Sequence, residues 1–107
     1  MAFDITSVLQ SMAGAVKDKV TTAWPQVQDV WKGFVQTNED ILQNIADGRI
    51  SGQLTDAQVQ SYMTNMKDLL QSQLLALEIM AEAIAQGAAN AALDVFWAAV
   101  KAAIPVI

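Results

Sequence analysis

Residues 47–58 read DGRISGQLTDAQ, and the turn-forming residues of the chain gather in this stretch. Its glycines and serine form the kind of cluster that connects regular segments. Gly48 suits the left-handed position just after the end of a helix. Thr55, with Gln58 three residues later, has the form of a capping box that begins one. The stretch therefore predicts a turn over residues 47–54 between two helices.

The segment before this turn carries apolar side chains at spacings of three and four, which is the helical period. Asp4 or Thr6 can cap its start. Pro25 interrupts the pattern, but the stripes on its two sides fall on one face when each residue is placed about 100° after the last. We therefore favour one arm over residues 4–46, kinked near Pro25. A complete break stays open, because the residue before a proline avoids the α region. The stripe consists of Ile5, Val8, Leu9, Met12, Val16, Val20, Ala23, Val27, Val30, Trp31, Phe34, Ile41, Leu42 and Ile45.

The segment after the turn continues one apolar stripe almost to the end of the chain. The stripe keeps the same helical spacing on both sides of Gly87, and Pro105 ends the helix. We therefore expect a second arm over residues 55–103. The stripe consists of Val59, Tyr62, Met63, Met66, Leu69, Leu70, Leu74, Leu77, Met80, Ala81, Ile84, Ala88, Ala92, Val95, Ala99 and Ala102.

The fold class that follows is all-α, in one domain spanning residues 1–107. We expect a long antiparallel helical hairpin, with its first arm kinked near Pro25 and with Gly87 as a candidate kink in the second, that assembles into a helical bundle. At about 1.5 Å per residue the arms are roughly 65–75 Å long. If the arms break instead, the same pieces form a compact four-helix bundle.

A second apolar stripe appears only in the last third of the chain. A helix that is apolar on two sides must be buried on both or face lipid. Two long arms offer little to cover this stripe, so we expect self-association into a homodimer or higher oligomer. The alternative is a helix contacted on both sides within one compact bundle. The stripe consists of Leu75, Ile79, Leu93, Trp97, Val100 and Ile104.

Alanines recur at spacings of four and three on the first stripe of this helix. Small residues at such spacing let another helix approach closely. Alanine is also simply the best helix former. We expect close helix packing at Ala81, Ala85, Ala88, Ala92 and Ala99.

Composition excludes several partners and chemistries. Six basic residues against eleven acidic ones give a net charge of −5, which disfavours nucleic acid and anionic membranes. The chain has neither cysteine nor histidine. Glu78 and Glu82 lie four residues apart, but di-iron helical sites pair glutamates with histidines. We therefore expect no metal, no cofactor and no enzymatic activity.

The function that these patterns favour is that of a non-enzymatic, self-associating helical-hairpin protein, an assembly or protein-interaction module. The alternative is a membrane-active or apolar-ligand-binding protein that uses its two-faced C-terminal helix. Lipid is the less favoured partner, because Glu82 and Gln86 interrupt the second stripe between Ile79 and Leu93. No stretch of about 18 residues lacks a charged or strongly polar group, so a simple membrane span is not expected. The N-terminal residues lack the features of a secretory signal, so the cytoplasm is the default location, with nothing that specifies it.

Overall fold

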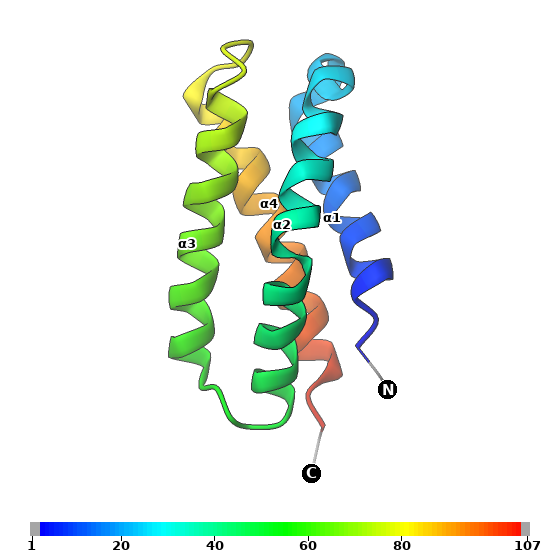
Figure 1. The fold of residues 1–107 in the computed structure, drawn as a ribbon, viewed down its shortest axis with the longest axis vertical. Helices are drawn as coiled ribbons and strands as arrows, with labels where there is room; N and C mark the ends of the chain where they lie inside the picture. Colours follow the sequence, from blue (N-terminus) through cyan, green and yellow to red (C-terminus); the bar gives the residue numbers. More distant parts are fainter. Residues whose placement is uncertain (1–2, 106–107) are drawn as a thin grey trace.

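Four α-helices and one 3₁₀ turn make up the part of the chain that the computed structural model describes, residues 3–105. The helices run alternately up and down, and the two ends of the chain lie at the same end of the bundle (Figure 1). The prediction of an all-α helical bundle is confirmed, and its form is the compact one with four helices. The elements are α1 (Ile5–Val20), η1 (Thr21–Ala23), α2 (Trp24–Ile50), α3 (Asp56–Leu75) and α4 (Glu82–Ala103).

The first arm is helical from residue 5 to residue 50, but it folds back on itself at η1. Thr21 has φ 50°, a backbone conformation that is uncommon for a residue other than glycine. Pro25 lies in the first turn of α2, where the N–H group that proline lacks would have no acceptor within the helix. The chain therefore reverses direction where a kink was expected, and the reversal begins at Thr21, four residues before Pro25. As a consequence the longest dimension of the molecule is 46 Å, well short of the arm length expected for a hairpin.

The second arm breaks between Leu75 and Glu82, so the prediction of one helix over residues 55–103 is wrong. Glu78 has φ 58° in this connection. Ala81 is the extended N-cap of α4 and supplies no side-chain hydrogen bond. Gly87, the candidate kink, lies inside α4.

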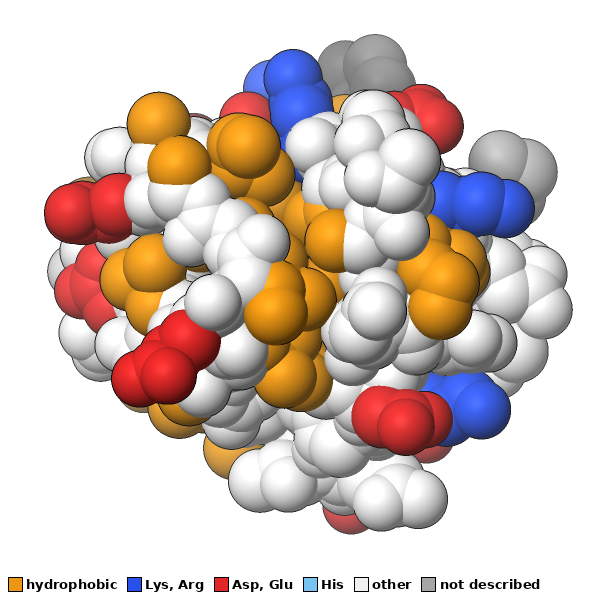
Figure 2. Space-filling model, turned by 90° about the horizontal axis from the view of Figure 1, so that it is seen from above, with side chains coloured by type: hydrophobic (Ala, Val, Ile, Leu, Met, Phe, Trp, Pro, Cys, Tyr) orange, Lys and Arg blue, Asp and Glu red, His pale blue; other side chains and the backbone are white. Residues whose placement is uncertain are grey.

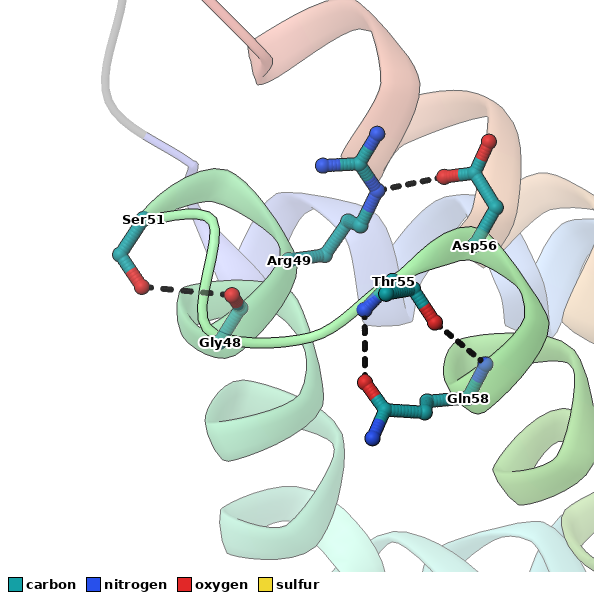
Figure 3. A network of polar contacts seen from close by, with 6 residues as sticks. All are labelled: Gly48, Arg49, Ser51, Thr55, Asp56 and Gln58. Carbon is teal, nitrogen blue, oxygen red and sulfur yellow. Dashed lines mark hydrogen bonds and ion pairs between the residues drawn. The ribbon is translucent and has the colours of Figure 1, made fainter.

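The connection between α2 and α3 is held by local polar contacts (Figure 3). The capping box is present, because the Gln58 N–H donates to Thr55 Oγ1 (3.2 Å) and the Thr55 N–H donates to Gln58 Oε1 (2.8 Å). Arg49 forms an ion pair with Asp56 across the turn. The expected role of Gly48 is wrong: α2 continues past it to Ile50, and Gly52 is the glycine with positive φ (85°).

Helix α4 makes the most extensive contacts in the bundle. It contacts each of the other three helices, most extensively α1. Phe96 lies in this core and meets the Phe3 ring edge-on, with 6.0 Å between ring centroids. Two residues of the second apolar stripe, Leu93 and Val100, are thus covered within one chain. The buried residues of α4 are Ala85, Ala88, Ala89, Ala92, Leu93, Phe96 and Val100.

Candidate interaction surface

The six residues expected to mediate self-association do not form one surface. Leu93 and Val100 are fully buried in the monomer. Trp97 and Ile104 are half-buried, and the Lys101 ammonium lies 5.6 Å from the centroid of the Trp97 ring. The remaining two lie near the start of α4, with Leu75 half-buried at the end of α3 and Ile79 exposed in the connection that follows.

The alanines expected at a close helix contact divide in a similar way. Ala85, Ala88 and Ala92 are fully buried, so their small size serves packing inside the bundle. Ala99 is half-buried and lines a shallow hollow with residues of α1. Ala81 is exposed at the N-cap of α4. The alanine pattern therefore belongs mainly to the monomer core.

Large apolar side chains are exposed elsewhere. Ile41 on α2 is 43% exposed, and Tyr62 and Leu69 on α3 are 45% and 39% exposed. Ile79 (46%) and Ile84 (43%) lie in the α3–α4 connection and at the start of α4. Exposed apolar residues that gather in one place mark interaction sites more often than scattered ones.

Two apolar hollows lie along the groove between α2 and α3, and each is lined by residues from both sides. The upper hollow, of about 450 Å³, lies toward the α3–α4 connection, and the lower one, of about 240 Å³, lies toward the α2–α3 turn. Leu69 lies seven residues after Tyr62 and four before Gln73, so all three share one side of α3. We call the residues of both hollows, with Leu69, the α2–α3 seam: Val30, Gly33, Phe34, Thr37, Ile41, Asn44, Ile45, Leu54, Tyr62, Leu69, Gln73, Ala76 and Leu77.

The α2–α3 seam has an uncharged lining and negatively charged side chains beside it. None of the described residues that line its hollows is charged. Three exposed aspartates of α2 lie beside them: Asp29 is four residues before Gly33, and Asp40 and Asp47 flank Asn44 at spacings of four and three. An apolar groove with an acidic edge results.

The basic residues of these helices point elsewhere. Lys32 lines a different hollow, between α1 and α2. Lys67 forms an ion pair with Asp94 of α4 (3.5 Å), and Arg49 is paired with Asp56 in the turn. No positive charge of the described chain therefore balances the acidic edge of the seam from within the groove.

The hollow between α1 and α2 is the other sizeable concavity, at about 360 Å³. Its floor includes Leu9 and Trp31, and Trp31 stacks on Phe34 with 5.6 Å between ring centroids. Its edge is polar and carries both signs of charge, from Lys32 and Glu39. Because the large apolar residues here are buried, this hollow offers less apolar surface to a partner than the α2–α3 seam.

A further apolar area lies at the end of the bundle where α4 begins. Figure 2 looks onto this end and shows apolar side chains gathered near its centre, with acidic and basic side chains around the edge. Within residues 3–105, α4 is the one helix long and apolar enough to cross a membrane, although core helices of soluble proteins meet the same criterion. Only 39% of its most apolar 18-residue window is buried inside the bundle.

The two glutamates considered as a paired carboxylate site lie near the start of α4. Glu78 and Glu82 are both exposed, the first in the α3–α4 connection and the second in the first turn of α4. The described residues contain no cluster of three or more potential metal ligands among His, Cys, Asp and Glu.

The seam residues Ile41, Tyr62 and Leu69 belong to the apolar stripes of the two arms, but their side chains are exposed. Each stands at the edge of its stripe, with polar neighbours three or four residues away. Leu69, for example, has Asn65 and Gln73 on adjoining turns. The fully buried Leu70 also has polar neighbours, Lys67 and Gln73, on its adjoining turns, so this pattern alone would not have separated the exposed residues from the core.

Comparisons of the chain with protein-family models, with curated proteins and with solved structures found no match.

Proposed function

We propose that this chain is a non-enzymatic protein-interaction module that assembles with other chains through the α2–α3 seam. The observation that carries the proposal is the gathering of Ile41, Tyr62 and Leu69 on a groove whose described lining has no charge. Docking a helix there would bury the exposed part of these side chains, which is 39–45% of each, and removal of apolar surface from water is favourable by about 25 cal/mol per Å².

The bundle does not need these exposed side chains to close its own core. Phe34 and Leu42 of α2, together with Met63 and Leu70 of α3, already fill the interior and are almost completely buried. The exposed seam residues are thus free to serve binding, where a few well-buried anchors supply most of the energy.

Self-association remains one form of this proposal. The seam would then be the interface between copies, in place of the C-terminal stripe, because Leu93 and Val100 are occupied in the core. The expected homodimer or higher oligomer would bury Ile41 and Leu69 of each copy.

The test compares two isoleucines of equal exposure. Ile41 and Ile84 are both 43% exposed, but only Ile41 belongs to the seam. Ile41→Asp should abolish concentration-dependent association in light scattering after size exclusion, and binding of amphipathic helical peptides, whereas Ile84→Asp should leave both unchanged. The proposal fails if Ile41→Asp and Ile84→Asp are indistinguishable from the wild-type protein in both measurements.

A second candidate function is membrane activity through α4, favoured by the length and apolar character of that helix. Insertion would require the bundle to open, because seven side chains of α4 are buried in it. Flotation with zwitterionic vesicles and a blue shift of tryptophan emission would support this candidate. Protein that stays at the bottom of the gradient, with unchanged emission, would eliminate it.

A further inference from the structure

We infer that the partner in the α2–α3 seam is a basic amphipathic helix of another protein; this inference rests on the function proposed above. Three features of the seam lead to it: its length, its apolar floor and the sign of the charge at its edge.

The length of the seam fits about four turns of helix. Along α2 it extends from Val30 to Ile45, and on the α3 side from Tyr62 to Leu77, which lies just past the end of that helix. At 1.5 Å per residue each side is about 20 Å long, which corresponds to a partner helix of roughly 15 residues.

The floor of the seam suits an apolar stripe on that helix. The upper hollow is edged by Val30 and Leu77, and the lower hollow by Ile41 and Tyr62. Two hollows in sequence along one groove can each receive an apolar side chain, and helices that bind in grooves present such anchors at spacings of three, four and seven. Leu69 lies between the two hollows on α3 and can contact the middle of the stripe.

The edge of the seam sets the charge of the partner. Asp29, Asp40 and Asp47 are exposed, and their spacings of eleven and seven keep them on one line of α2. Lysine or arginine beside the apolar stripe of a bound helix would lie next to this line. Charges of this kind at the edge of an interface act mainly on partner choice and association rate.

The same line of charge disfavours two other occupants. In a two-fold dimer each patch meets its own copy, so a seam-to-seam dimer would bring two rows of aspartates into one interface. An anionic membrane surface would be repelled by the same carboxylates. A partner with positive charge beside its apolar stripe avoids both conflicts.

The experiment uses two synthetic 16-residue helical peptides with the same leucine stripe, one with lysine and one with glutamate beside it. Fluorescence anisotropy at low salt should show the lysine peptide binding at least about tenfold more tightly, a difference of about 1.4 kcal/mol. Added salt should weaken its binding. Leu69→Asp should abolish binding, whereas Ile84→Asp, away from the seam, should retain it.

Matched charge variants test the acidic edge. Asp40→Asn should weaken binding of the lysine peptide several-fold and reduce its salt dependence, whereas Asp18→Asn, at an exposed position on α1, should change neither. Equal binding of the two peptides, or equal effects of the two asparagine variants, would overturn the inference.

The remaining outcomes separate the inference from the proposed function. If neither peptide binds but the wild-type protein forms a dimer that Leu69→Asp dissociates, the occupant is a second copy; the inference is then wrong and the proposed function stands. If the lysine peptide binds Leu69→Asp and Ile41→Asp as tightly as wild type, or if the protein neither associates nor binds either peptide, both fail.

Discussion

Leu54 occupies the space that a side chain on Gly48 would need. A Cβ atom on Gly48 would stand 2.7 Å from Leu54 Cδ1 and 2.8 Å from Leu54 Cγ, closer than real Cβ contacts. The Leu54 N–H donates to the Gly48 carbonyl oxygen at 2.9 Å, so backbone and side chain close the turn together. Because Leu54 also lines the lower hollow, this contact links the α2–α3 turn to the seam.

Replacing Gly48 with alanine should therefore destabilise the protein. Crowding in a packed region costs about 1–3 kcal/mol, and the gain in helix propensity, up to about 1 kcal/mol, offsets only part of it. We expect Gly48→Ala to lower the free energy of unfolding by about 1–2 kcal/mol in urea denaturation.

Gly14 supplies the matched control for this substitution. It is exposed within α1, and a Cβ there would have no neighbour within 4 Å. Gly14→Ala should raise the free energy of unfolding by about 0.5–1 kcal/mol through propensity alone. A gain of similar size for both variants would contradict the contact between Gly48 and Leu54.

The capping box at the start of α3 gives a second prediction. Thr55→Ala removes the hydroxyl that accepts from the Gln58 N–H, and loss of such a cap costs about 1 kcal/mol. Thr64 in the same helix is exposed, and its hydroxyl only donates to the Gln60 carbonyl oxygen of the preceding turn. Thr64→Ala should therefore be neutral or slightly stabilising. Thermal unfolding that shifts equally for the two variants would rule out the cap as the cause.

The α2–α3 connection could be predicted from the sequence because its capping residues and its glycines are recognisable by residue type. Thr55 and Gln58 form the expected reciprocal hydrogen bonds. The glycine assignment was wrong because Gly48 and Gly52 both fit a helix end by type, and only packing against Leu54 distinguishes them.

The other two connections could not be predicted in the same way. Thr21 and Glu78 adopt positive φ without being glycine, and residues 76–81 contain neither glycine nor proline. Apolar residues also keep their helical spacing on one face across both connections, so this spacing did not indicate that the chain reverses there. The topology also decides the exposure of the C-terminal stripe: four packed helices bury Leu93 and Val100, which a long hairpin would have left uncovered.

Leu93 and Ile79 separate the two interpretations of the C-terminal stripe. Both belong to that stripe, but Leu93 is fully buried in the monomer and Ile79 is 46% exposed. Leu93→Ala should lower the free energy of unfolding by about 2–5 kcal/mol, independent of protein concentration, because it leaves a cavity in the core. Ile79→Ala should change it by less than about 1 kcal/mol. A loss at Leu93 that disappears when the protein is diluted would instead place this residue between subunits.

The α3–α4 connection provides the sharpest test of the topology, because one substitution should have opposite effects at two neighbouring glutamates. Glu78 has φ 58°, which costs a residue with a Cβ roughly 1–2 kcal/mol relative to glycine. Glu78→Gly relieves that cost and loses somewhat less through the greater freedom of the unfolded chain. We expect a net gain of about 0.5 kcal/mol in the free energy of unfolding.

Glu82 lies in the first turn of α4, where it has helical backbone angles and a carboxylate near the positive end of the helix dipole. Glu82→Gly removes both advantages and should lower the free energy of unfolding by about 1 kcal/mol. Urea denaturation of the two variants, each compared with wild type, measures the difference in sign. If residues 55–103 formed one continuous helix, Glu78 would stand in its interior, and Glu78→Gly would be at least as destabilising as Glu82→Gly.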